Sequence, residues 1–345
     1  MVALALGSAP WLRELAPPAQ AGPGAADLVD AISASERTSH TGVVTASGTV
    51  TVPEANTFTS VAELFGGPNR IRVFWQDGEH WRLDRVRSTG ETDLYRSPLR
   101  TTRWVFESRR VRVSLAAPVR LPNTSDVLPG TLARRVLQGA RPEELTALPP
   151  RRVAGLDAAG VRLSPTTPQA SIDHVDIWAD PDSGLPLQVQ VYVESDRPVV
   201  STAYERLDLD APARDTLDFT PPADAEVAID ELTDVAGRSD RFAPYQAPET
   251  LAGLPLRADR PELPTGAVGV YGRGPTVLLF LPLRGSAARP LRRELGATGD
   301  SQGTAVDLGA IAALVTPPRY RGSGLRRRRT AALCSPSPSR ATAYS

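Results

Sequence analysis

The sequence predicts a mostly β (α+β) protein, in which an antiparallel sheet with a helical cover is followed by a smaller C-terminal α+β domain. Three observations predict this class. Apolar and polar residues alternate over many short segments, glycine and proline turn signals separate those segments, and helical periodicity is confined to a few short stretches. A sheet with one apolar face needs a cover, which such helices can supply.

The composition is that of a globular chain without net charge. The 345 residues are enough for two domains, and 41% of them are hydrophobic. The 39 basic residues are all arginine and balance 39 acidic residues, so no global field recruits nucleic acid, and no nucleic-acid partner is expected. The lack of lysine, with abundant alanine, glycine and proline, indicates a GC-rich genome such as that of an actinobacterium.

Both ends of the chain differ from the part between them. Residues 1–24 contain the apolar run Val2–Gly7 and then a Pro/Ala/Gly-rich stretch, which we interpret as the remnant of a signal segment and a linker; an unstructured cytoplasmic start is the alternative. Residues 317–345 contain four consecutive arginines and predict a disordered tail. Either it is a basic tail for anionic lipid or nucleic acid, or, as we favour, an out-of-frame translation artefact.

The first half of the sheet begins after a short amphipathic helix at Ala25–Glu36. The alternation over Gly42–Val52 predicts a strand. A meander follows over Asn69–Leu115, with one bulky apolar face and one arginine-rich face, and with turns expected at Asp77-Gly78 and at Ser88–Glu91. A second helix near residues 131–139 is expected to complete the cover.

The second half of the sheet is predicted from shorter segments. Strands are expected over Arg151–Gly155, Gly160–Leu163, Ile172–Ala179, Leu185–Val193 and Val199–Asp208, and the double proline of Asp218–Pro222 is expected to close the sheet.

The chain changes character after about Asp224. A hairpin is expected from Ala267–Tyr271 and Thr276–Leu283, followed by a helix at Arg289–Leu295. We therefore divide the chain into residues 25–225 and a smaller domain of residues 226–316.

A resemblance to a known family rests on two motifs. Val175–Asp180 reads V-D-x-W-x-D, and Ser183–Val189 reads S-G-L-P-L-x-V. With the segments around them, these resemble the LolA/RseB superfamily of lipoprotein carriers and sigma-E regulatory proteins, in particular its actinobacterial MucB/RseB-like members. The same pattern includes Thr202–Tyr204, Leu207–Leu209, Phe219–Pro222, Arg72–Trp75, Gly78, Trp81–Asp84 and Trp104–Phe106.

The resemblance covers roughly Ala25–Ala225 and implies a curved, unclosed antiparallel half-barrel. In that family helices lie on the concave face and an apolar cavity beneath them holds acyl chains. The aromatic and aliphatic residues of the meander are then candidate lining residues, with ordinary packing as an equally weighted alternative. These candidates are Ile71, Val73, Trp75, Trp81, Leu83, Trp104 and Phe106.

No motif predicts an enzyme, a metal site or a cofactor. His40, His80 and His174 lack ligand-spaced neighbours, and there is no G-x-S-x-G elbow, although a dispersed Ser/His/Asp triad stays open. Gly269–Gly274 and the pair Asp180/Asp182 are interpreted as turns rather than as phosphate or calcium sites. The lone Cys334 permits no internal disulfide.

Two functions from different classes therefore remain. The first is a non-enzymatic extracytoplasmic binding protein that holds a lipid or lipoprotein-like apolar ligand. The second is an RseB-like regulatory protein that contacts an anti-sigma factor or a membrane transporter. An enzyme comes third, and no charged anchor for the ligand is evident in the sequence.

Overall fold

The computed structural model describes residues 23–49, 63–65, 67–115, 122–193, 196–229, 247–257, 268–280, 282–284, 304–308 and 311–315. Its largest unit is a sheet of twelve strands. The strands are β1 (His40–Gly48), β2 (Asn69–Trp75), β3 (Trp81–Arg87), β4 (Gly90–Ser97), β5 (Arg100–Val105), β6 (Arg110–Leu115), β7 (Leu145–Val153), β8 (Leu156–Leu163), β9 (His174–Ala179), β10 (Pro186–Tyr192), β11 (Val200–Asp208) and β12 (Glu226–Ile229).

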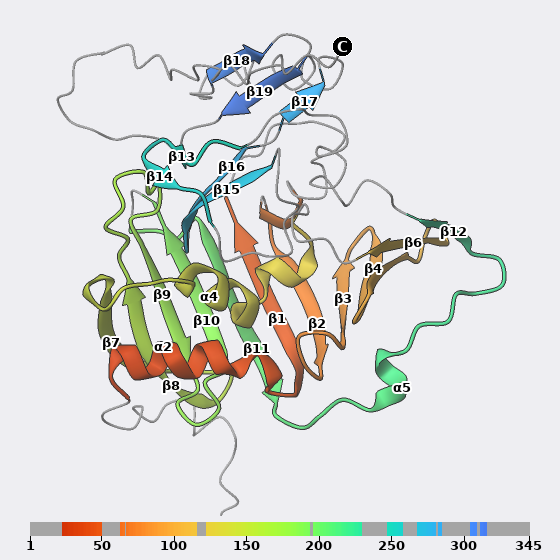
Figure 1. Cartoon of the computed structure of the whole chain (residues 1–345). Coiled ribbons are helices and arrows are strands. Elements are labelled where there is room, and N and C mark those ends of the chain that lie inside the picture. The colour runs from red at the N-terminus through yellow and green to blue at the C-terminus, as the bar shows by residue number, and fades with distance from the viewer. Residues whose placement is uncertain are drawn as a thin grey trace, which may run out of the picture.

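The strand order makes this sheet an open, curved half-barrel. It runs β12-β6-β5-β4-β3-β2-β1-β11-β10-β9-β8-β7, so β12 and β7 form two separate edges (Figure 1). All neighbouring strands pair antiparallel except β12, which runs parallel to β6. The predicted antiparallel half-barrel is confirmed.

The two predicted turns of the meander have clear local causes. Asp77 Oδ1 accepts hydrogen bonds from the amides of Glu79 and His80 at 2.8 and 2.9 Å, which fixes the turn between β2 and β3. Gly90 begins β4 with a φ of 146°, a conformation that favours glycine. These turns set the register of three consecutive strands.

Two α-helices, α2 (Ala25–Ala34) and α4 (Pro129–Leu137), lie against the same face of the sheet (Figure 1). Leu28 and Ile32 of α2 are fully buried and cluster with Val136 of α4 and with Val161 and Ile177 of the sheet. Two short 3₁₀ turns extend this cover, η1 (Ser35–Arg37) and η2 (Thr124–Val127), and a third, η3 (Pro142–Glu144), directly precedes β7. We call the face beneath α2, η2 and α4 the inner face, and the opposite one the outer face.

The segment after β11 crosses the outer face and returns to the sheet. It includes the single turn α5 (Arg214–Leu217), which lies beside β3, and Phe219, whose ring lies 4.8 Å from Tyr95 and 6.0 Å from Trp104 (Figure 1). The chain then adds β12 to β6. The sequence-based expectation that Asp218–Pro222 closes the sheet is wrong, because the prolines end the crossing segment and a further strand follows.

The C-terminal part forms small antiparallel pairs. They are built from β13 (Thr250–Leu251) with β14 (Leu254–Pro255), β15 (Gly269–Arg273) with β16 (Thr276–Phe280), and β19 (Ile311–Val315) with β17 (Pro282–Arg284) and β18 (Thr304–Leu308). The predicted hairpin around residues 272–275 is confirmed. Arg273 Nη1 pairs with Glu144 Oε2 at 2.7 Å, and this guanidinium lowers the pKa of the Glu144 carboxyl.

Several predictions lie outside the described residues. They are the signal remnant of residues 1–22, the helix at 289–295 and the tail at 317–345. The division at residue 225 stays a proposal. Among the described residues, no helix is both long enough and apolar enough to cross a membrane.

Candidate functional site

Five of the seven candidate lining residues lie together on the inner face. Register places Ile71, Val73 and Trp75 of β2 in one row, with Val73 opposite Leu83 and Trp75 opposite Trp81 of β3. All five are at most 5% exposed, and the rings of Trp75 and Trp81 stack with their centroids 5.8 Å apart. The structure therefore brings these residues into one apolar layer, as their alternation predicts.

Trp104 and Phe106 do not join that layer. Trp104 pairs with Asp93, which pairs with Asp84, and both carboxylates belong to the outer face. Trp104 packs against Phe219 there, while Phe106 lies beyond the end of β5 and is 59% exposed. The prediction that all seven residues point into one concave space is therefore wrong for these two.

Among the described residues, the cover of the inner layer beside β2 and β3 consists of η2, the start of α4 and Leu64. Val127 of η2 and Leu128 pack against the layer, with Leu64 alongside. Trp75 donates through Nε1 to the carbonyl of Glu36 at 2.9 Å, and the Arg134 guanidinium lies 5.9 Å from its ring centroid. A 3₁₀ turn and the first turns of one helix thus close a wide apolar surface.

A buried histidine closes one end of the inner layer. His40 Nδ1 lies 2.8 Å from the carbonyl of Thr38 and therefore donates to it, which leaves Nε2 to accept from the Tyr204 hydroxyl at 2.7 Å. Burial lowers the pKa of His40 to about 4 and raises the pKa of Tyr204. A neutral histidine with both ring nitrogens paired serves packing rather than metal binding.

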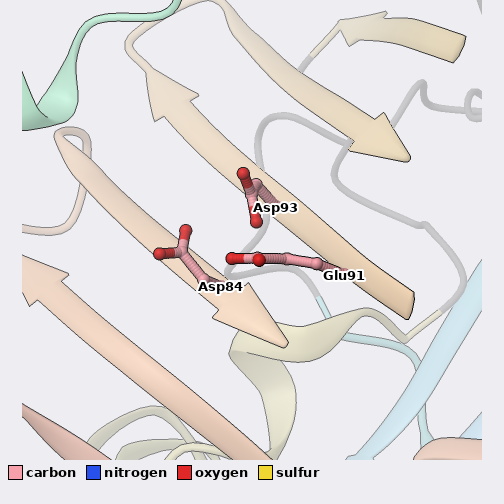
Figure 2. Close-up of side chains that lie close together, drawn as sticks. All are labelled: Asp84, Glu91 and Asp93. Atoms are coloured by element: carbon pink, nitrogen blue, oxygen red, sulfur yellow. The ribbon is translucent and has the colours of Figure 1, made fainter. Parts of the chain in front are cut away.

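The outer face carries a cluster of three carboxylates, Asp84, Glu91 and Asp93, over β3 and β4 (Figure 2). Arg72 Nε and Arg82 Nε pair with Asp84 at 3.2 and 2.7 Å, Arg72 also pairs with Glu91, and Arg82 Nη2 lies 3.7 Å from Asp93. Two guanidinium groups thus face three carboxylates. Burial, together with the charges of Asp84 and Glu91, raises the pKa of Asp93 to about 7.

This cluster is a poor fit for a metal ion. Its carboxylate oxygens lie within 4.8 Å of one another, which suits a cation, but two arginines already occupy two of the three carboxylates. A cation would have to displace both of them. Burial and the two neighbouring carboxylates instead raise the pKa of Asp93 and so favour its protonated form.

A groove of about 310 Å³ lies on the outer face where β1, β2 and β11 meet, beside the bulge between Val43 and Val44. Val43 and Phe74 form its apolar part on the outer face, and Arg72 and Arg206 its charged part. Of the seven candidate lining residues, only Val73 borders this groove. The groove is therefore a different feature from the inner layer.

The arginine-rich face of the meander was expected, but the acidic residues that pair with it were not identified from the sequence. The observed loop is centred on Gly78 and sets Arg72 opposite Asp84, whereas a two-residue turn at Asp77-Gly78 would set Arg72 opposite Leu83. The next turn sets Asp84 opposite Asp93. Counting outward from the predicted turns therefore does not place the cluster, because an error of one residue in the register reverses the face.

Comparisons with known proteins agree with the fold. Neither a family model nor a curated protein matches the sequence. Among solved structures, MucB is 18% identical with a TM-score of 0.44, over 85% of this chain and 92% of MucB. The matching chain in the Pseudomonas aeruginosa MucA/MucB complex is 17% identical with a TM-score of 0.43, over 84% of this chain and 92% of its own length.

A LolA superfamily protein from Nitrosomonas europaea is more distant. It is 10% identical with a TM-score of 0.25, over 57% of this chain and 98% of its own. These solved structures are similar to this chain in fold at 10–18% sequence identity. What this chain binds has to be inferred from its own residues.

Proposed function

We propose that this chain is a non-enzymatic extracytoplasmic binding protein that holds a lipid or lipoprotein-like ligand against the inner face of its half-barrel. The observation that carries this proposal is the apolar layer of Ile71, Val73, Trp75, Trp81 and Leu83 beneath η2 and the start of α4. Displacing η2 and the start of α4 would expose that layer to an acyl chain without breaking the sheet.

The energetics allow useful affinity. Each methylene group that leaves water contributes about 0.8 kcal/mol, so ten of them give roughly 8 kcal/mol before ordering costs. A bound acyl chain would displace Val127 and Leu128 from the layer, so the net free energy gained on binding is smaller. Micromolar binding, about 8 kcal/mol, is an upper expectation.

A matched pair of variants tests this proposal. Trp81 on the inner face and Trp104 on the outer face are 5% and 6% exposed. In protein stripped of lipid, Trp81→Leu is expected to weaken binding of a fluorescent fatty acid by about tenfold, roughly 1.4 kcal/mol. Trp104→Leu is expected to leave it unchanged. Circular dichroism checks that both variants fold, and equal effects of the two substitutions would reject an inner-face site.

A second candidate function is contact with an anti-sigma factor or a membrane transporter. It is favoured by apolar side chains exposed near the β6–β12 edge, where Leu115 is 70% and Ile229 is 74% exposed. A photo-crosslinker at position 115 is expected to capture such a partner in cells. Position 99, where Leu99 is 78% exposed between β4 and β5, provides the control. Equal capture from both positions would remove the support.

A further inference from the structure

The inner face of β3 changes from apolar to basic along its length. Trp81 and Leu83 are followed on the same face by Arg85 and Arg87. Arg85 is only 3% exposed, which is unusual because a guanidinium group stays charged and needs partners when it is buried. The basic end therefore lies directly beside the apolar layer.

These arginines are incompletely paired. Arg85 Nη2 lies 3.3 Å from Glu63 Oε2, and its Nη1 lies 3.5 Å from Asn69 Oδ1. Both distances are long compared with about 2.8 Å for a charge-assisted hydrogen bond. Among the described residues, neither the Nε atom of Arg85 nor that of Arg87 has a hydrogen-bond partner, and both atoms are buried. Two donors at this end of β3 thus lack an acceptor within the described part of the chain.

Positive charge exceeds negative charge around them. Arg87 Nη1 shares the Glu63 carboxylate at 2.5 Å, and the charge of Arg103 on β5 acts on Arg85. Arg112 of β6 lies opposite Arg103. The other described carboxylate near this end is that of Glu107, which lies beside Gly90 and accepts the Glu91 amide at 2.8 Å. The two arginines of β3 therefore share one carboxylate, that of Glu63, and the charge of Arg103 adds to theirs.

We infer that Arg85, Arg87 and Arg103 bind a phosphate group, for which the Glu63 carboxylate stands in when no ligand is bound. The forked guanidinium donors match phosphate oxygens, and a doubly charged anion would balance the excess. The inference rests on the proposed function in one respect. An acyl chain on Trp81 and Leu83 ends beside Arg85, so the ligand is a phosphorylated amphiphile rather than a neutral lipid.

The test compares two soluble amphiphiles with the same acyl chain, lysophosphatidic acid and a monoacylglycerol, on the full chain in phosphate-free buffer. The wild type is expected to prefer the phosphorylated one by about tenfold, the size of one charge-assisted hydrogen bond. The double variant Arg87→Gln/Arg103→Gln is expected to lose this preference while it binds the monoacylglycerol as before. Arg70→Gln, which removes one positive charge from the outer face at a side chain 57% exposed, is expected to keep it.

The variant Glu63→Gln distinguishes a phosphate site from a purely structural ion pair between Glu63 and the arginines. Glu63→Gln removes the competing carboxylate, so it is expected to tighten lysophosphatidic acid binding several-fold. Equal binding of the two amphiphiles by the wild type, or weaker binding by Glu63→Gln, would overturn the inference.

Inorganic phosphate distinguishes the source of the ligand. If it competes with lysophosphatidic acid at millimolar concentration, the arginines bind the phosphate itself. If phosphate binds through these arginines while neither amphiphile binds, the site stands as one for free phosphate and the lipid function fails. Binding of monoacylglycerol with no phosphate preference would keep the lipid function and reject the arginine site.

Discussion

At the scale of single residues, two buried ionisable groups, Asp93 and His40, make stability depend on pH in opposite directions. Asp93 sits among carboxylates on the outer face, and His40 is enclosed on the inner face. Neither group could be identified from residue type. Asp93 matters because the register sets it opposite Asp84, and His40 because Tyr204 and Trp75 surround it.

Asp93→Asn is expected to stabilise the protein at pH 8. The folded pKa of about 7 exceeds the ordinary value of 3.8 expected in the unfolded chain, so the folded chain binds more protons. This group therefore lowers the free energy of unfolding as the pH rises from about 4 to 7. Asparagine mimics the protonated carboxyl, and the gain should be at least about 1 kcal/mol, the equivalent of one pKa unit. Urea unfolding at pH 5 and pH 8 measures it; the same gain at both would contradict the account.

His40→Gln is expected to reduce acid sensitivity. The folded pKa of about 4 lies below the ordinary value of 6.5 expected in the unfolded chain, so the unfolded chain binds more protons. The free energy of unfolding therefore falls as the pH drops from about 6.5 to 4. The variant should lose about 1 kcal/mol at pH 7 through its hydrogen bonds. Its unfolding free energy should then fall less than that of the wild type between pH 7 and pH 4.5. An unchanged acid dependence would show that His40 is not the buried base.

At the scale of elements, alternation within a strand was predictable, and the relation between strands was only partly so. The row Ile71, Val73 and Trp75 is buried as its spacing predicts. Trp104 is also a bulky apolar residue in an alternating strand. Which face it occupies depends on the pairing register of β4 with β5, and a shift of one residue in that register would reverse the face. Phe219 has no periodicity to mark it, because it lies in a crossing segment that only tertiary packing holds.

Phe219→Ala is expected to loosen this crossing segment from the outer face. Its ring covers Tyr95 and Trp104, and it is partly buried, so the cost should be about 2 kcal/mol, below the range for fully buried phenylalanines. Tryptophan emission should shift to the red as Trp104 gains solvent. Leu99→Ala, at a side chain 78% exposed, should change stability by less than about 0.5 kcal/mol. A neutral Phe219→Ala would mean that the segment does not pack there.

At the scale of the whole molecule, the half-barrel and its helical cover followed from strand alternation, turn signals and family resemblance. The site followed less completely. Five of seven lining residues lie together, yet the basic end at Arg85 was missed. Leu83 and Arg85 lie on the same face of β3, and only the residue type distinguishes them in the sequence. A charged residue at such a position normally indicates that this end of the strand is exposed to solvent. Its burial depends on Glu63 and Asn69, which are distant in sequence.

The central claim is that an acyl chain lies on the inner face. Two single-tryptophan proteins test it, one that keeps Trp81 and one that keeps Trp104, with phenylalanine at the four other tryptophan positions. A brominated fatty acid quenches tryptophan on contact. The account predicts saturable quenching of Trp81 and none of Trp104, because the sheet separates them. Quenching of Trp104 alone, or of both to the same extent, would contradict it.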